Sequence, residues 1–347
     1  MMKPIIAISM GDASGIGPEI AVKTLADHRW AEKCVPVVVG DLAPMEDALR
    51  FTNRDIPINL VNTPQEAQNI DRCINLIDMG LVKKGEWKYK KVQANCGGAS
   101  VNYVRHAAGF AIDGLAHAIV TGPINKEAFN LAGVHFAGHT EILADLTRAE
   151  NYSMLLISGN LRIIHVTTHV SMRNACDLIT KERVFKVICL AKEAMTLIGI
   201  DEPNIGVAGF NAHCSENGLF GDEEAAAIIP AIEAAKNIGI SADGPVPPDT
   251  VFVKAQSGMY DVVVAMYHDQ GHIPLKLSGF KLDTKTNRYE SMSGVNCTVG
   301  LPIIRTSVDH GTAFGKAGEG RANEESLVDA INIATTMAHV KFDKNSS

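Results

Sequence analysis

Short apolar runs alternate with longer amphipathic stretches along the whole chain. The apolar runs are rich in β-branched residues and are bounded by turn-forming residues, which is typical of buried strands. Strands are predicted over residues 5–9, 35–39, 74–78, 118–121, 161–167, 204–209 and 261–266. Helical spacing predicts helices over residues 19–25, 103–115, 181–198, 222–237 and 324–339. This alternation predicts an α/β fold with a largely parallel sheet.

The length of 347 residues favours two lobes over one. Since no linker separates them, the chain is expected to cross between the lobes more than once. We predict a discontinuous first lobe from residues 1–125 plus 306–347, and a second lobe from residues 126–305. Residues 281–294 are polar and lack periodic apolar positions, so a surface insertion or lid is predicted there.

Composition narrows the functional classes. The net charge is −7 and long blocks of like charge are missing from the sequence, which argues against nucleic-acid and anionic-membrane binding. The sequence has no uncharged apolar run of the ~18 residues that a membrane helix needs. The seven cysteines are irregularly spaced without a CxxC pair, as expected for reduced thiols in a cytoplasmic protein.

Three histidines each follow an apolar, strand-like run: His169, His213 and His268. Ligands of open α/β sheets bind beyond the carboxyl ends of the strands. Three imidazoles brought to that edge, with positions left open for substrate, suit a catalytic divalent metal. The alternative is that each is a hydrogen-bonded or surface histidine. Imidazole ligands suit zinc, manganese, cobalt or nickel, and magnesium is a further candidate.

Two further histidines, His165 and His272, lie four residues from a candidate ligand, which is the HxxxH spacing of a metal-binding histidine pair on a helix. On a strand, the spacing of His165 and His169 separates them by about 13 Å, too far to share one ion. Gly271 and Pro274 argue against a stable helix after His268, so His272 is predicted to be a neighbour rather than a ligand. Asp269 is expected either to orient an imidazole or to cap a helix.

A glycine loop, residues 11–19, joins the first predicted strand to the first helix. Its backbone amides make Gly15 and Gly17 candidates for a phosphate-binding loop. The spacing matches neither common nucleotide-binding motif, and a tight strand-to-helix turn is the alternative.

Other polar residues are candidates for binding an anionic substrate. Arg305 and Lys276 follow apolar runs, where a cation is costly to bury without an anionic partner. The alternative is a surface cation whose stem packs on apolar neighbours. Asn296 could add a hydrogen bond. His139 and Thr140 stand at a predicted helix start, where Thr140 could instead be a plain N-cap. The spacing of Asp309 and His310 assigns them no role.

Taken together and in order, these motifs resemble the 4-hydroxythreonine-4-phosphate dehydrogenase family from end to end. The segments that carry the resemblance are GDASGIGPE (11–19), TGPINK (121–126), GHTE (138–141), TTH (167–169), NAH (211–213), YHDQG (267–271) and LPIIRTSVDHG (301–311). Residues 268–276 and 216–221 look closer to the branch that acts on 4-phospho-D-threonate and 4-phospho-D-erythronate.

The resemblance implies an isocitrate/isopropylmalate-dehydrogenase-like α/β/α fold and a homodimer whose interface lies in the second lobe. It also implies NAD as oxidant and one divalent metal ion shared between the subunits. By matching position, the metal ligands are His169, His213 and His268. The substrate-binding positions that the family pattern implies are His139, Thr140, Lys276, Asn296 and Arg305.

The expected reaction is NAD-dependent oxidation of the 3-hydroxyl of a 4-phosphorylated hydroxy acid, with decarboxylation to dihydroxyacetone phosphate. Lys276, Asp309 and His310 are the candidates for proton transfer in this reaction. The first alternative is the 4-hydroxythreonine-4-phosphate dehydrogenase reaction of pyridoxal phosphate synthesis. A three-histidine metallohydrolase and a small-anion-binding protein are the others.

The chain departs from the family pattern around one candidate ligand. Ala212 replaces a proline before His213, and Cys214 and Ser215 replace small residues after it. Cys214 is expected to be either an inert thiol or a fourth, sulfur ligand. The interval from Lys276 to Asn296 is longer than usual because of the polar insertion.

Overall fold

The computed structural model describes residues 3–284, 288–292 and 294–343. Two compact units divide the chain: residues 1–149 with 301–347, and residues 150–300. From the sequence, the chain was expected to pass between the lobes at residues 125/126 and 305/306. The boundaries between the two compact units lie at residues 149/150 and 300/301. His139 and Thr140 therefore lie in the same unit as Arg305.

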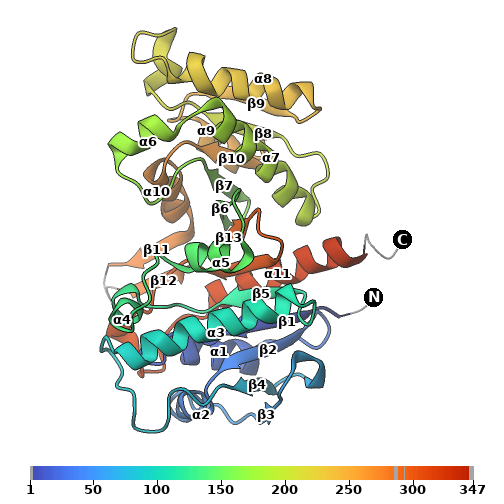
Figure 1. The fold of residues 1–347 in the computed structure, drawn as a ribbon, viewed down its shortest axis with the longest axis vertical. Helices are drawn as coiled ribbons and strands as arrows, with labels where there is room; N and C mark the ends of the chain where they lie inside the picture. The colour runs from blue at the N-terminus through green and yellow to red at the C-terminus, as the bar shows by residue number, and fades with distance from the viewer. Residues whose placement is uncertain (1–2, 285–287, 293, 344–347) are drawn as a thin grey trace. The chain divides into compact units, whose positions relative to one another are not determined.

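The first unit is built on a parallel sheet (Figure 1). Its strand order is β3 (Ile58–Leu60), β4 (Ile74–Asp78), β2 (Val35–Gly40), β1 (Ile5–Ser9), β5 (Ala118–Thr121) and β14 (Ile304–Val308), and each neighbouring pair is parallel. All six residues of β2 are buried, as are all four of β5. Continuous apolar strands of this kind are typical of a parallel sheet with both faces covered.

The first unit has six helices among the described residues: α1 (Gly17–Asp27), α2 (Leu42–Phe51), α3 (Ala94–Ile112), α4 (Lys126–Leu131), α5 (His139–Thr147) and α11 (Glu325–Asp343). Short 3₁₀ turns lie at Pro64–Glu66 and Phe314–Lys316. Helices α4 and α5 pack on α3, and α2 packs on α1. Helix α3 contacts β1, β2 and β5, and α11 contacts β5 and β14. Helix α3 begins earlier than predicted and includes Gly97, which is a packing residue. A Cβ there would lie 2.2 Å from the Ala128 carbonyl carbon, so α4 crosses α3 where only glycine fits.

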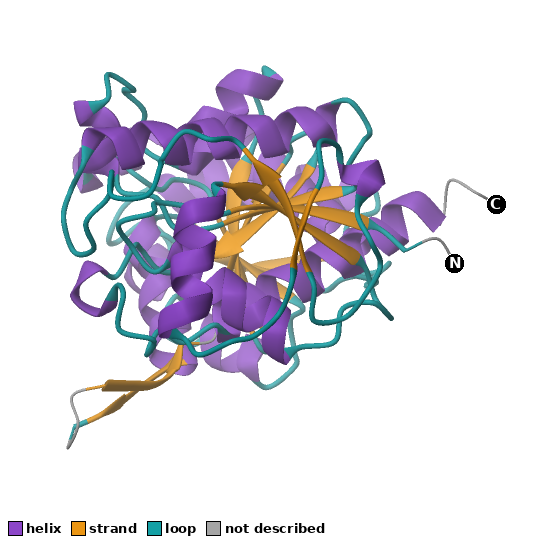
Figure 2. Cartoon of the chain, turned by 90° about the horizontal axis from the view of Figure 1, so that it is seen from below, coloured by secondary structure: helices purple, strands orange, loops and turns teal. Residues whose placement is uncertain are grey.

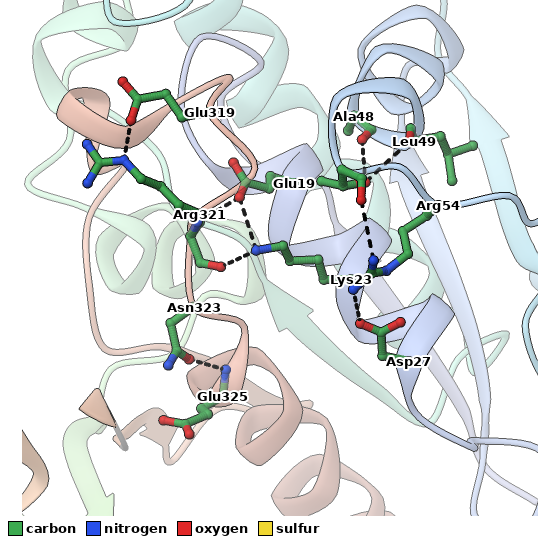
Figure 3. Close-up of polar contacts among 12 residues, drawn as sticks. Glu19, Lys23, Asp27, Ala48, Leu49, Arg54, Glu319, Arg321, Asn323 and Glu325 are labelled. Carbon is green, nitrogen blue, oxygen red and sulfur yellow. Dashed lines mark hydrogen bonds and ion pairs between the residues drawn. The ribbon is translucent and has the colours of Figure 1, made fainter. Parts of the chain in front are cut away.

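Two side chains of α1 hold the segment that leads into α11 (Figure 3). The Glu19 carboxylate accepts the Ala322 N–H at 2.6 Å, and Lys23 Nζ donates to the Ala322 carbonyl at 2.6 Å. Glu19 is buried and pairs with Lys23 at 3.3 Å. Satisfying both backbone groups of Ala322 in this way docks the segment on α1.

The second unit has a mixed sheet in the order β13 (Val295–Val299), β6 (Ser153–Ser158), β7 (Leu161–His165), β10 (Val262–Ala265), β8 (Ile205–Ala208) and β9 (Ala242–Val246). Strand β6 runs antiparallel to β13 and β7, while β7, β10, β8 and β9 are mutually parallel. The predicted α/β class with a largely parallel sheet is confirmed.

The helices of the second unit are α6 (Met172–Leu178), α7 (Lys181–Leu197), α8 (Ile229–Asn237), α9 (Val251–Gln256) and α10 (His268–Gly279). A 3₁₀ element (η2) spans Ala212–Glu216, and a π-helix (η3) spans Glu224–Ile228 immediately before α8. Strands β7, β8 and β10 share a core cluster with α9 and α10 that includes Ile163, Val263 and Leu275.

The polar stretch 281–294 contains regular structure where none was predicted. Strands β11 (Phe280–Asp283) and β12 (Arg288–Met292) pair antiparallel as a separate two-stranded sheet (Figure 2). Residues 285–287 and 293 of the predicted insertion lie outside the described residues. Among the helices that the structure describes, each is too short or too polar to cross a bilayer.

Candidate functional site

Two of the three candidate metal ligands lie side by side in the second unit. His169 follows β7 and His268 begins α10 directly after β10, the strand that pairs with β7. Their ring centroids are 5.9 Å apart. Both line a cleft of about 400 Å³ whose other residues are Thr168, Val170, Ser171, Met172, Ala175, Tyr267 and Asp269. The rule that parallel strands deliver polar residues to one edge holds for this pair.

The expectation that Gly271 and Pro274 prevent a helix after His268 is wrong. Helix α10 runs through both residues. Its start is fixed by Gln270, whose side chain accepts the Met266 N–H at 2.6 Å and donates to the Gly209 carbonyl at 2.8 Å. These bonds tie the first turn to the ends of β10 and β8, and they offset the backbone bond that Pro274 cannot make.

Helix α10 brings His272 onto His268. The two rings stack at 3.6 Å between centroids with 9° between their planes, and His272 Nδ1 lies 3.0 Å from the His268 carbonyl. His272 in turn lies 4.8 Å from the ring of His165. His272 is therefore a direct neighbour of His268, although the helix that brings it there was not predicted. Its ring limits how the His268 imidazole can turn.

His165 is fully buried under α10. Its Nδ1 lies 3.2 Å from the Met154 carbonyl, and a Cβ on Gly271 would lie 2.3 Å from its Nε2. Burial, with a smaller contribution from His272, lowers the pKa of His165 to about 3. The ring is therefore neutral in the folded protein and belongs to the core rather than to the cleft.

This buried histidine should make the protein sensitive to acid. The His165 pKa is about 3 when folded and about 6.5 when unfolded, so only the unfolded chain binds the proton in between. The stabilisation is complete above pH 6.5 and is lost as the pH falls toward 3. Between pH 7 and 5 the loss is about 2 kcal/mol. Urea unfolding at both pH values should show the wild type losing that much more than His165→Leu. Equal losses in the two proteins would contradict this account.

His213 lies on η2, which follows β8, the other parallel neighbour of β10. The side chain is exposed. Within one chain, and among the described residues, no three His, Cys, Asp or Glu side chains are grouped closely enough to hold a metal ion. The structure thus brings His169 and His268 together and does not add His213 to them within a single chain.

Asp269 contacts one of the candidate ligands. Its Oδ1 lies 2.7 Å from His268 Nδ1, which agrees with the predicted role of orienting an imidazole. The helix-cap alternative is wrong, because Tyr267 occupies the N-cap position of α10 and no side chain among the described residues caps that helix end. The Cys214 thiol donates to the Pro245 carbonyl at 3.4 Å, and burial raises its pKa. Both observations favour the inert thiol over the sulfur ligand.

A second group of predicted residues gathers in the first unit. Arg305, on β14, is buried and donates from Nη2 to Thr121 Oγ1 at 2.8 Å. His139 Nε2 lies 3.1 Å from the Gly122 carbonyl. Burial, and then the charge of Arg305, lower the pKa of His139 to about 3. A neutral imidazole thus lies close to a buried guanidinium at the carboxyl end of β5.

The other candidate substrate-binding and proton-transfer residues lie on four different segments. Thr140 is not an N-cap, since Gly138 occupies that position before α5. Lys276, in the last turn of α10, places Nζ 4.4 Å from the centre of the Phe280 ring, and Asn296 is on β13. His310 Nδ1 lies 3.0 Å from the Gly311 carbonyl, and the Asp309 N–H donates to Ser326 Oγ at 3.1 Å.

The glycine loop favours the tight-turn interpretation. A Cβ on Gly17 would lie 2.2 Å from the Met10 carbonyl oxygen, and one on Gly15 would lie 2.9 Å from Thr312. The Gly15 N–H donates to the Asp12 carbonyl and the Ile16 N–H to the Thr312 carbonyl. The N–H groups of Gly15 and Ile16 thus already donate to backbone carbonyls, and the loop is buried. We infer that the glycines are there because the backbone passes too close to its neighbours for a side chain.

A buried carboxylate, Glu224, contacts the segment that leads to His213 and was not predicted from the sequence. Glu224 opens η3 and accepts hydrogen bonds from the backbone just before the histidine. The sequence signal was a run of three acidic residues, Asp222, Glu223 and Glu224, following Gly221, and that pattern is common on protein surfaces.

Comparison with known proteins places the chain in a family. Residues 32–334 match the family of the pyridoxal phosphate biosynthetic protein PdxA. D-threonate 4-phosphate dehydrogenase from Cupriavidus necator is 44% identical over 336 residues, which is 96% of this chain and 97% of that protein. The crystal structure of 4-hydroxythreonine-4-phosphate dehydrogenase from Klebsiella pneumoniae is 42% identical with a TM-score of 0.84, covering 97% of this chain and 100% of that one. Terephthalate 1,2-cis-dihydrodiol dehydrogenase from Burkholderia xenovorans is 30% identical with a TM-score of 0.66, covering 96% and 98%.

The chain is an oxidoreductase of the dehydrogenase class, as predicted. It belongs to the PdxA family. Proteins similar to this chain over nearly their whole length carry names with different substrates.

Proposed function

We propose that the protein oxidises the 3-hydroxyl of 4-phospho-D-threonate or 4-phospho-D-erythronate with NAD and a divalent metal ion, and that decarboxylation follows. The products are dihydroxyacetone phosphate, carbon dioxide and NADH. The observation that carries the proposal is the pair His169 and His268, which face one cleft in a chain similar over its whole length to a D-threonate 4-phosphate dehydrogenase.

The donor set fits a divalent ion. Metal–nitrogen bonds of about 2.0–2.1 Å allow one ion between two imidazoles whose ring centroids are 5.9 Å apart. His169, His213 and His268 would hold the ion, with one of the three supplied by a second copy of the chain. When bound, the ion supplies Lewis-acid chemistry to an alcohol and to the carbonyl that the alcohol becomes.

The protein's own residues supply binding and orientation. Arg305 is a buried cation whose guanidinium can pair with a carboxylate or phosphate through two hydrogen bonds. Because His139 is neutral, it can hydrogen-bond the substrate without adding charge. Thr140, Lys276 and Asn296 are proposed as further substrate contacts, and Asp309 with His310 as groups that move a proton.

Exposed apolar side chains support the proposed homodimer. Val170 and Met172, which line the cleft, are 42% and 55% exposed. Leu219 and Phe220 follow the His213 turn and are also exposed. Large apolar side chains near a functional cleft are typical of an interaction surface. A second copy packed against this unit would cover them and bring another histidine to the cleft.

A substrate panel tests the proposal. Absorbance at the NADH band should rise when metal-replete enzyme and NAD receive 4-phospho-D-threonate or 4-phospho-D-erythronate, and a chelator should abolish the rise. Preference for 4-phosphohydroxythreonine would instead favour the reaction of pyridoxal phosphate synthesis. Release of phosphate without NAD would indicate a metallohydrolase, and binding without turnover would indicate an anion-binding protein. If none of the three acids gives NADH, the dehydrogenase proposal is refuted.

A further inference from the structure

His213 stands at the start of a left-handed turn. Five consecutive residues without a glycine among them have positive φ angles: His213 at 51°, Cys214 at 56°, Ser215 at 68°, Glu216 at 46° and Asn217 at 60°. Each non-glycine residue in this region costs roughly 1–2 kcal/mol. A run of this length persists only where the surrounding structure holds it, and such strain is concentrated at functional sites.

A buried carboxylate holds the entry to the turn. Glu224 Oε1 accepts the N–H groups of Phe210 at 2.8 Å and Asn211 at 2.7 Å. Its Oε2 accepts the side-chain amide of Asn211 at 2.9 Å. Glu224 is only 3% exposed. A buried carboxylate that accepts three N–H donors fixes the backbone that enters the turn two residues before His213.

Ser215 fixes the C-terminal end of the left-handed turn. Its carbonyl oxygen accepts the N–H groups of Gly218, Leu219 and Phe220, and its hydroxyl donates to the Gly221 carbonyl. Ser215 itself is buried. The turn is thus fixed at both ends. The His213 side chain between them is exposed, so its burial does not contribute to the stability of the fold.

We propose that Glu224 is a positioning residue for His213: it holds the strained turn so that the imidazole is presented to a metal ion in one orientation. This inference rests on the proposed function, in which His213 is a metal ligand. Glu224 acts through the backbone of Phe210 and Asn211 rather than by touching the metal or the substrate. Losing such a supporting group typically costs about 10–100-fold in metal affinity.

Zinc affinity and hydrogen exchange of the full-length chain, stripped of metal, test this role. Glu224→Gln keeps the side-chain shape but puts an N–H₂ group where one oxygen accepted. Exchange of the Phe210 and Asn211 amides should speed up, and Zn²⁺ should bind at least about tenfold more weakly. The matched control is Glu223→Gln, because Glu223 Oε2 accepts the Asn211 side-chain amide, at 2.7 Å, whereas Glu224 also accepts two backbone N–H groups. It should change Zn²⁺ affinity less than about twofold. Should Glu224→Gln not fold, Glu224→Asp, which retains the charge but shortens its reach, takes its place.

A double variant separates the positioning role from a general structural one. In a His213→Ala background, Glu224→Gln should weaken Zn²⁺ binding no further, because its effect passes through the missing imidazole. A further loss in that background overturns the proposal, as does unchanged affinity in Glu224→Gln alone. If His213→Ala itself leaves Zn²⁺ affinity unchanged, the ligand set of the proposed function is wrong and the positioning role falls with it.

Discussion

Alanine at His169, His213 or His268 should each abolish metal-dependent NADH formation, yet some mixtures of these inactive variants should regain it. If the ion is shared, two of the histidines at each site come from one chain and the third from its partner. A mixed dimer then has one intact site whenever its two substitutions fall on ligands from opposite chains. Random exchange of subunits makes half of the dimers mixed, so about a quarter of the wild-type activity should return.

The three pairwise mixtures control for one another. Two should recover activity and one should not, because two of the ligands come from the same chain. The variant common to both recovering mixtures identifies the histidine that the partner donates. Each mixture is unfolded and refolded together, with metal content measured alongside NADH formation. If none of the three mixtures recovers while wild type treated alike does, the ligands come from one chain and the shared site is wrong.

Gly271→Ala should both destabilise the protein and impair metal binding. The new methyl group would lie 2.3 Å from His165 Nε2 and 2.8 Å from Ile163 Cγ2, so α10 must shift and His268 with it. Overpacking of this kind costs about 1–3 kcal/mol, even though alanine favours a helix more than glycine does. Urea unfolding and Zn²⁺ titration measure the two effects.

Gly109 provides the matched control, because it is also a helical glycine but has nothing within 4 Å of its added Cβ. Gly109→Ala should stabilise the protein by about 0.5–1 kcal/mol and leave Zn²⁺ affinity unchanged. Removing the His165 ring should relieve the clash. Gly271→Ala should therefore lower the free energy of unfolding by less in a His165→Ala background than in the wild type. Equal stability changes at Gly271 and Gly109 would contradict the packing argument.

The parts of the fold that depend on local pattern were predictable from the sequence. Strands such as β1 and β5 coincide with their predicted ranges because buried parallel strands are continuous apolar runs. Helix α10 was missed because its start is set by the contacts of Gln270 with two strand ends, which no local propensity records. The hairpin of β11 and β12 was missed because its residues are polar and its pairing is visible only in three dimensions.

Prediction of the site was limited in the same way. Strand-end position identified His169 and His268 as neighbours, because adjacent parallel strands end at the same edge. The closeness of His139 to Arg305 depends on the pairing of β5 with β14, whose residues are far apart in sequence. Glu224 could not be assigned a role, because its importance comes from the backbone conformation of another segment.

The return of the chain to its first unit has a consequence for how the protein is made. Strand β14 pairs with β5 across more than 180 residues, and α11, which covers both strands, is synthesised after β14. The second unit is contiguous and can complete its contacts while β5, paired with β1 on one side, still lacks β14 on the other. During synthesis the second unit can therefore fold before the first is complete, and the edge of β5 must be kept from other chains until β14 pairs with it.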